Sequence, residues 1–258
     1  MKTIGVVVPT LFTRPDFLRQ SLEAIAKAGN VHVILMGPNV EENSGPYESL
    51  FDQLIEEPKE GSLASKLSFA LNSFPENIEL ITWIGDDDIL EPASLDFLES
   101  MFQENKELSL IYGACRYIDS NGGAIGMNKS GPWALKLSSF GPFLAPQPGS
   151  LFRKKAFIAA GGLDPKLKLA FDFDLFRSLS KQGKAKYVQK PLASFRWHSD
   201  SLSVSQRKTS VKEASIVRLK HASHLLKPIL RVTNPVVEIA TFLAGAILSW
   251  RLKTRATP

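Results

Sequence analysis

The apolar and polar positions along the first 110 residues alternate between two periodicities. Four apolar runs rich in β-branched residues predict buried strands, at residues 4–9, 31–36, 80–84 and 108–112. Stretches with apolar residues every three or four positions predict the helices between them, at residues 15–29, 61–72 and from 92 past 102. A loop rich in Gly, Pro and acidic residues is expected at 37–61. This order predicts a mainly parallel, right-handed, doubly wound α/β sheet with helices on both faces.

The pattern changes after residue 113. Residues 116–125 predict a hairpin, because Asn121-Gly122 supplies the positive φ angles of a tight turn. A Gly- and Pro-rich loop is expected at 126–149. Helices are expected at 153–160 and 172–182, the second followed by short strands, which we place at 185–188 and 192–197.

Three adjacent carboxylates, Asp86, Asp87 and Asp88, follow the predicted strand 80–84 and precede a helix. They therefore lie at the edge where α/β sheets bind ligands. Like charges this close repel each other unless a cation neutralises them, and hard oxygen ligands suit Mg²⁺ or Mn²⁺. The alternative is an acidic turn or a helix N-cap, where aspartate is also favoured.

Composition and charge narrow the class of protein. An apolar content of 44% is that of a folded globular chain, and one cysteine, Cys115, excludes an intramolecular disulfide framework. The apolar run that begins at Ile4 is too short for a signal peptide. Residues 207–258 carry a net charge of +8, whereas residues 1–206 carry −3. Such a basic segment can bind either nucleic acid or an anionic membrane surface.

The apolar content of this tail favours the membrane. Residues 211–227 predict a basic amphipathic helix, and residues 235–250 are almost wholly apolar except for Glu238. About sixteen residues is short of the roughly 20 that a transmembrane helix needs. We expect this segment to lie in a membrane interface, and the alternatives are packing on its own domain or in a homodimer. Nucleic acid is disfavoured because the body is acidic.

Several short motifs occur in an order that resembles family 2 glycosyltransferases of the GT-A fold, over about residues 4–205. No single motif is specific, whereas the ordered series is. The motifs are Val7-Val8-Pro9-Thr10 with Arg14, the helix 61–72, Trp83-Ile84-Gly85-Asp86-Asp87-Asp88, residues 147–153, Gly161-Gly162-Leu163-Asp164, Asp172-Phe173-Asp174, and Phe195-Arg196-Trp197-His198.

The resemblance implies the GT-A fold, with a Rossmann-like sheet. It also implies an enzyme that transfers a hexose-type sugar from a nucleotide diphosphate donor to a hydroxyl acceptor, with inversion at the anomeric carbon. Asp86, Asp87 and Asp88 resemble the family's D-x-D element, with Asp88 and Asp86 as metal ligands and Asp86 and Asp87 toward the donor. Gly85 replaces the Asp or Asn that is more usual there, so which pair of the three aspartates is used is left open. His198 resembles a late histidine that completes the metal shell or contacts the diphosphate, and the alternative is a structural histidine.

A carboxylate is also needed to take the proton of the acceptor hydroxyl, and Asp172 is the candidate general base. It matches the second member of an acidic dipeptide, whose first member is Phe171 in this chain. A helix N-cap is the alternative role. Asp174 is the rival base, although its position in the predicted helix allows it to face solvent instead.

The donor is expected to contact the loop after the first strand, through Pro9, Thr10 and Arg14, and to contact Lys66. Arg14 and Lys66 have the alternative of solvated helix positions. Relatives often carry an acidic residue after the second strand to read the base, where this chain has Gly37-Pro38-Asn39. The base and the sugar are therefore left open.

These expectations divide the chain into a glycosyltransferase domain at 1–206 and a basic, apolar helical tail at 207–258. Within the domain, residues 1–112 form the nucleotide-sugar half and residues 113–206 the acceptor half. The resemblance implies surface glycan assembly with a saccharide or lipid-linked acceptor. The basic, apolar tail predicts a cytoplasmic protein that lies peripherally on the inner membrane face. Two alternatives stay open: a non-catalytic sugar- or nucleotide-binding assembly partner, and a sugar nucleotidyltransferase.

Overall fold

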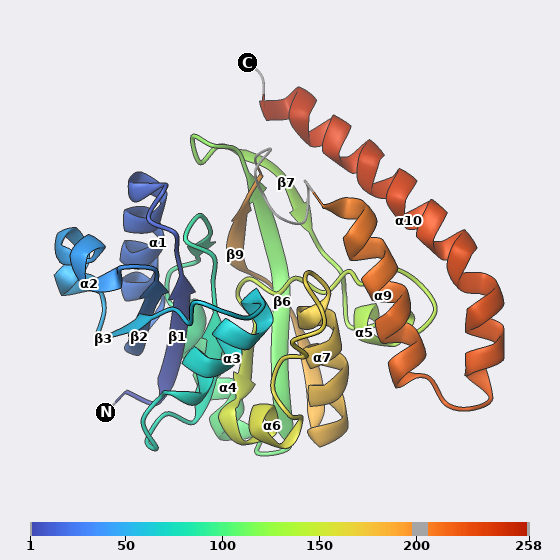
Figure 1. The fold of residues 1–258 in the computed structure, drawn as a ribbon, viewed down its shortest axis with the longest axis horizontal. Coiled ribbons are helices and arrows are strands. Elements are labelled where there is room, and N and C mark those ends of the chain that lie inside the picture. Colours follow the sequence, from blue (N-terminus) through green and yellow to red (C-terminus); the bar gives the residue numbers. More distant parts are fainter. Residues whose placement is uncertain (1, 198–205, 257–258) are drawn as a thin grey trace.

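A computed structural model describes residues 2–197 and 206–256 and contains one mixed sheet of nine strands (Figure 1). Eight of them lie in the order β3-β2-β1-β4-β8-β6-β9-β5, and β7 pairs with β6. The strands are β1 (Ile4–Pro9), β2 (Val31–Gly37), β3 (Gln53–Glu56), β4 (Leu80–Trp83), β5 (Ile89–Leu90), β6 (Leu108–Ile118), β7 (Ala124–Asn128), β8 (Leu151–Arg153) and β9 (Lys184–Arg196).

The first half of the sheet is parallel, as predicted. Strand β1 pairs with β2 on one side and β4 on the other, with Ile4 opposite both Val31 and Leu80. The expected loop at 37–61 is wrong in part, because it contains β3, which extends the sheet parallel to β2. It also contains α2 (Val40–Asn43) and the 3₁₀ helix η1 (Gly45–Leu50). Strand β3 lies at the sheet edge and has only four residues, so its apolar pattern is weak.

In the second half of the sheet, parallel and antiparallel strand pairs both occur. Strand β8, which the sequence pattern did not predict, pairs antiparallel with both β4 and β6, and β5 pairs antiparallel with β9. The hairpin around Asn121-Gly122 is confirmed as the antiparallel pair β6-β7. The two short strands expected at 185–188 and 192–197 form one strand, β9, which runs parallel to β6 with register shifts near Gly113 and Ala114.

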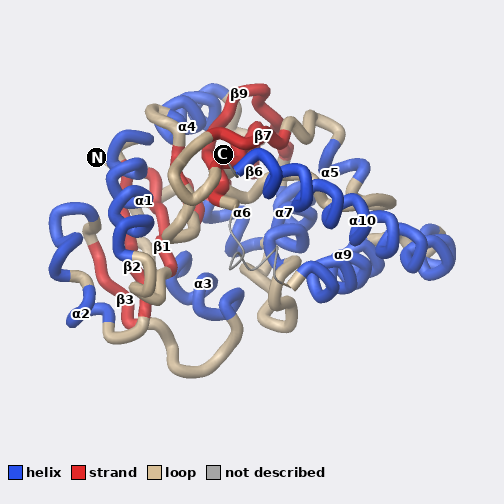
Figure 2. The backbone as a smooth tube through the Cα atoms, turned by 90° about the horizontal axis from the view of Figure 1, so that it is seen from above, coloured by secondary structure: helices blue, strands red, loops and turns tan. Residues whose placement is uncertain are grey.

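Helices cover both faces of the sheet (Figure 2). On one face α1 and α4 pack on Val6 and Val8, whereas Val7 points to the other face, toward α3 and α7. This alternation follows from the period of two in a strand. The helices of the body are α1 (Pro15–Ala28), α3 (Leu63–Asn72), α4 (Ser94–Glu104), α5 (Ala134–Leu137), α6 (Lys154–Ala159) and α7 (Phe171–Gln182). The predicted α/β fold with helices on both faces is thereby confirmed.

Two further helices follow the body, α9 (Arg207–His221) and α10 (Leu226–Ala256), and α10 lies along the outside of α9 (Figures 1 and 2). Helix α10 continues through Pro235, so the apolar run at 235–250 is part of a longer helix. The helix expected at 211–227 is wrong in its end, because α9 ends at His221 and α10 begins at Leu226. Over residues 226–254 it is long and apolar enough to cross a membrane, with a mean hydropathy of 1.5 in the most apolar part. It is the one such helix in the described part of the chain, and length and composition alone are weak evidence of a span.

Candidate active site

Two neighbouring parallel strands bring the predicted donor residues together. Because β1 and β4 run side by side in the same direction, the loop after Pro9 meets the loop after Trp83. The Thr10 hydroxyl donates to Asp86 Oδ2 at 2.7 Å. The Arg14 guanidinium donates to Asp86 Oδ1 at 3.0 Å and to Asp87 Oδ2 at 2.7 Å. Two of the three carboxylates are thus held by one arginine.

Asp88 is held from another side, by the end of β9. Its Oδ1 accepts the backbone N–H of Arg196 at 2.9 Å. The Arg196 side chain is almost fully buried, donates to the Asp87 carbonyl oxygen at 2.9 Å and lies 4.3 Å from the centre of the Phe17 ring. Sequence reasoning gave Arg196 no role, although it quoted the motif that contains it. Its position at the end of the last sheet strand was the available signal.

The charge state of Asp88 follows from this enclosure. Burial, followed by the negative charge of Asp87, raises the pKa of Asp88 well above its ordinary value, and the hydrogen bond from the Arg196 backbone only partly opposes this. A buried carboxylate among like charges is stabilised most by a cation. The site therefore favours a positive ligand beside Asp88.

The glycine before the three aspartates makes room for their carboxylates. A Cβ atom at Gly85 would lie 2.8 Å from Asp87 Oδ1 and 3.4 Å from Asp88 Oδ2. A side chain at Gly85 would displace a carboxylate.

The donor set fits a hard divalent cation with few protein ligands. Carboxylate oxygens are what Mg²⁺ and Mn²⁺ prefer, and Mg²⁺ commonly takes one or two carboxylates together with substrate phosphates. Across residues 2–197 and 206–256, no three Asp, Glu, His or Cys side chains are grouped to hold a metal. A cation bound at Asp88 and Asp86 would therefore rely on other oxygen ligands. His198, the third predicted ligand, lies outside the described residues.

Asp172 begins α7 close to the same edge of the sheet. The preceding Phe171 ring lies 6.1 Å from the Trp83 ring at the end of β4. The partly exposed Asp172 carboxylate accepts the N–H of Phe173 at 2.7 Å. Burial raises the pKa of Asp172 to about 6, against the lowering effect of two backbone hydrogen bonds. This value suits a group that takes a proton near neutral pH.

The loop before Asp172 is anchored by a residue from α9. Both Glu213 carboxylate oxygens face the backbone, and they accept N–H groups of Lys168 at 2.9 Å, Leu169 at 2.8 Å and Ala170 at 3.0 Å. Glu213 is buried, and sequence reasoning missed it because it lies on the predicted tail. The position of Asp172 therefore depends on α9.

Asp174 does not face solvent, so that expectation is wrong. It is buried, and its carboxylate pairs with Lys220 Nζ and His221 Nε2, each at 2.8 Å. Burial alone would raise the pKa of Asp174, but the hydrogen bonds from His221 and Lys220 outweigh it and lower the pKa. Asp174 is thus a structural ion-pair partner of α9, which disfavours it as the base.

Lys66 lies apart from the acidic cluster. Its Nζ pairs with Glu57 Oε1 at 2.9 Å, and the Glu57 backbone N–H donates to the Gly37 carbonyl oxygen. The pair thus lies where β2 and β3 end, at the same sheet edge. The structure does not bring Lys66 to Asp86 or Asp87, and contact with a donor stays a prediction.

Arg14→Met is expected to destabilise the metal-free protein by about 1–2 kcal/mol, because two partly buried carboxylates lose their shared cation. Added Mn²⁺ is expected to raise the melting temperature of this variant more than that of the wild type, since the metal replaces the lost charge. Thermal unfolding with and without Mn²⁺ measures both effects. Arg19→Met, an arginine on the same helix that lies over Tyr47, is the control. Equal responses to Mn²⁺ in all three proteins would contradict the prediction.

The sequence is similar to those of two polysaccharide synthases. No family model matches the sequence. The chain is 26% identical over 157 residues to a chondroitin synthase of Pasteurella multocida strain Pm70, and 26% identical over 161 residues to a hyaluronan synthase of Pasteurella multocida. These matches cover 61% and 62% of this chain but only 16% of each relative, so the chain spans a small part of their length.

Solved structures support the fold. Residues 1–349 of S. aureus TarS in complex with UDP match with a TM-score of 0.62 at 12% identity, covering 89% of this chain and 68% of TarS. A mannosyltransferase of Pyrobaculum calidifontis, in complex with GDP-Man and Mn²⁺, matches with a TM-score of 0.61 at 13% identity, covering 96% and 74%. The predicted GT-A glycosyltransferase fold is confirmed by these likenesses.

Proposed function

We propose that this chain, which has the GT-A glycosyltransferase fold, transfers a hexose-type sugar from a nucleotide diphosphate donor to a hydroxyl of a saccharide or lipid-linked acceptor. The observation that carries the proposal is the juxtaposition of the acidic cluster at Asp86, Asp87 and Asp88 with a half-buried carboxylate, Asp172, at the same sheet edge. Sequence likeness to two polysaccharide synthases supports sugar transfer in glycan synthesis.

The proposed reaction assigns one task to each part of the site. The acceptor oxygen forms a bond to the anomeric carbon as the bond from that carbon to the diphosphate breaks. Asp172 takes the proton of the acceptor hydroxyl. A divalent cation, Mg²⁺ or Mn²⁺, held by Asp88 and Asp86 would offset the charge of the leaving nucleoside diphosphate. Arg14 and Thr10 orient the carboxylates, and inversion at the anomeric carbon is part of the proposal.

Release of nucleoside diphosphate tests the reaction. Purified protein incubated with UDP- and GDP-sugars and Mn²⁺, without acceptor, is expected to hydrolyse at least one donor slowly, and EDTA is expected to stop it. Chromatography of the nucleotides measures this. Donor binding with no turnover, with or without a panel of saccharide acceptors, would favour the alternative of a non-catalytic assembly partner.

A sugar nucleotidyltransferase is the second alternative, and the first loop disfavours it. That chemistry normally holds a triphosphate in a glycine-rich, basic loop after the first strand. Residues 9–14 contain no glycine, and their one cation, Arg14, pairs with Asp86 and Asp87.

We also propose that α10 places the protein on the cytoplasmic face of a membrane, because its outward side is apolar. The side that faces the body combines buried Leu230 and Leu252 with polar contacts, in which Asn234 bonds Arg218 and Ser249 bonds Arg207. The outward side is apolar, with exposed Ile229, Val232, Val236, Ile239, Phe242, Leu243, Ile247 and Trp250. Burying these side chains in the interface, beside cations of the tail that meet anionic headgroups, stabilises association.

Changing the outward face of α10 is expected to release the protein from membranes. Ile239→Ser, Leu243→Ser and Trp250→Ser combined should reduce sedimentation with anionic vesicles at least about tenfold, because three exposed apolar groups lose their contact with lipid. The melting temperature should stay near the wild-type value, since these side chains face away from the body. Ile158→Ser, an exposed apolar residue on α6, is the control.

Two results would contradict membrane association. The first is a wild-type protein that stays in the supernatant when it is centrifuged with anionic vesicles at low salt. A wild-type dimer in solution that the triple substitution converts to a monomer would instead assign the same face to a homodimer.

A further inference from the structure

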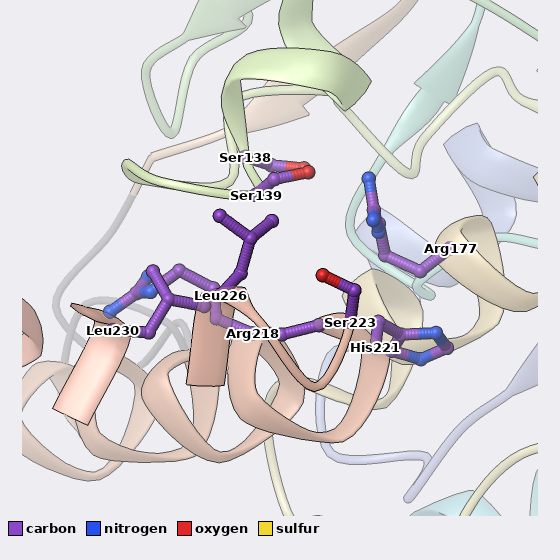
Figure 3. Close-up of a pocket in the computed structure, with 9 residues that line it drawn as sticks. Ser138, Ser139, Arg177, Arg218, His221, Ser223, Leu226 and Leu230 are labelled. Carbon is purple, nitrogen blue, oxygen red and sulfur yellow. The ribbon is translucent and has the colours of Figure 1, made fainter. Parts of the chain in front are cut away.

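A small cavity lies away from the acidic cluster, between α5, α7, α9 and the beginning of α10 (Figure 3). Its volume is about 50 Å³. At roughly 10–15 Å³ for each water, it has room for a few waters or for one tetrahedral oxyanion. Its polar lining includes Ser139, Arg177, Arg218 and Ser223, and Leu226 closes one side.

The two arginines of this cavity have only neutral hydrogen-bond partners. Arg177, on α7, donates to the Leu135 carbonyl oxygen at 3.0 Å. Arg218, on α9 and almost fully buried, donates to neutral oxygen atoms at distances of 2.6–3.1 Å, which belong to Asn234, Ser215 and Gly141. Neither arginine forms an ion pair within residues 2–197 and 206–256.

Of the nearby acidic side chains, only Glu238 acts on this charge, and it forms no ion pair with either arginine within the described residues. Asp174, one helical turn before Arg177, is engaged by Lys220 and His221 instead. Burial lowers the pKa of Arg177, and it lowers the pKa of Arg218 with only the charge of Glu238 opposing it. Buried or half-buried charges in proteins are normally paired. Two unpaired guanidinium groups beside one cavity therefore indicate a missing anion.

The remaining groups complete a site for that anion. In Figure 3 the Ser223 hydroxyl, from the connection between α9 and α10, and the Arg177 guanidinium, from α7, face the cavity, and Ser139 lies above it. The cavity also adjoins the beginning of the 31-residue helix α10, whose dipole adds positive potential there. The His221 ring turns toward Asp174, so His221 lines the cavity but does not contribute a ligand for the anion.

We propose that this cavity binds a phosphate group, held chiefly by Arg177 with Ser223 and Ser139. Guanidinium groups recognise phosphate through paired, charge-assisted hydrogen bonds. The phosphate belongs to a soluble phosphate ester or to the headgroup of a membrane lipid, since the apolar helix α10 begins at the cavity. The site is separate from sugar transfer, and its existence does not depend on the proposed function.

Inorganic phosphate is the probe, used with EDTA so that the acidic cluster holds no metal. At ionic strength matched with chloride, phosphate is expected to raise the melting temperature of the full chain saturably. Arg177→Gln should melt at or above the wild-type temperature in chloride, because an unpaired charge is removed. Its phosphate dissociation constant, from calorimetry, should be at least about tenfold weaker.

Matched variants separate this site from general anion effects. Lys181→Gln, an exposed cation on the same helix, should bind phosphate like the wild type. Ser223→Ala, which changes no charge, should bind several-fold more weakly and provides a second measurement should Arg177→Gln fold poorly. Equal phosphate binding by Arg177→Gln, Ser223→Ala and wild type would overturn the proposal, as would a response no larger than that to chloride.

Vesicles then decide the source of the phosphate. The full chain is sedimented with phosphatidylcholine vesicles that contain phosphatidic acid, whose phosphate is a monoester. If the cavity binds the phosphate of a lipid headgroup, less of Arg177→Gln than of Lys181→Gln should sediment with these vesicles. Equal sedimentation of the two variants, together with the phosphate titration, assigns the cavity to a soluble phosphate ester.

Discussion

Replacing Asp88 by asparagine is expected to lower the turnover of sugar transfer by about a hundred- to a thousandfold. The amide has the size of the carboxylate, and its oxygen can still accept the backbone N–H of Arg196. What it lacks is the negative charge that would hold a divalent cation against the leaving diphosphate. Loss of one preorganised electrostatic contact to a developing charge costs rate by about this factor. Steady-state release of nucleoside diphosphate measures the change.

The same substitution should leave the fold at least as stable. The pKa of Asp88 is raised by burial and by the charge of Asp87, so ionised Asp88 destabilises the native state at neutral pH. The neutral amide of the variant carries no such cost, and thermal unfolding at pH 7 without metal should show an equal or higher melting temperature. Asp16→Asn, an exposed acid in the first turn of α1, is the control. Wild-type turnover in Asp88→Asn would contradict the proposed metal role.

Asp172→Asn is expected to reduce turnover by about 10²–10⁴-fold, the usual contribution of a general base. The pH profile separates this role from a structural one. Wild-type activity should rise as the pH increases through about 6, because only the ionised carboxylate takes a proton. The variant should lose this limb of the profile together with its rate.

Stability should change in the opposite direction with pH. The folded pKa of Asp172, about 6, lies above the ordinary value of 3.8, so the protonated group favours the native state. This contribution is fully present below pH 3.8 and is lost as the pH rises through about 6. Asp172→Asn should therefore be no less stable than the wild type at pH 7, as measured by thermal unfolding.

Asp174→Asn is the matched comparison, two residues along the same helix. It removes the charge that Lys220 and His221 share, so it should lower the melting temperature. The rise in activity near pH 6 should persist in this variant. If Asp174→Asn abolished that rise while Asp172→Asn kept it, the two roles would be exchanged.

Much of the donor-side geometry could be predicted from the sequence. The β-branched runs specify β1, β2, β4 and β6, and parallel neighbours place the ends of β1 and β4 at one edge. That placement alone brings Thr10 and Arg14 to the acidic cluster. Local pattern was sufficient there because each of these strands is buried on both faces and each residue of the site directly follows one. The strands missed, β3, β5 and β8, have four residues or fewer, and the partners of β5 and β8 are distant in sequence.

The sequence by itself determined the kind of chemistry: three adjacent carboxylates after a buried strand, a fourth at the start of a later helix, and a basic, apolar C-terminal segment. Only the tertiary structure decided how the charge states of these carboxylates differ. Burial raises the pKa of Asp172, whereas the pKa of Asp174 is lowered in spite of burial because α9 supplies Lys220 and His221. Charge state depends on burial and on partners from distant segments, and neither is present in a local pattern.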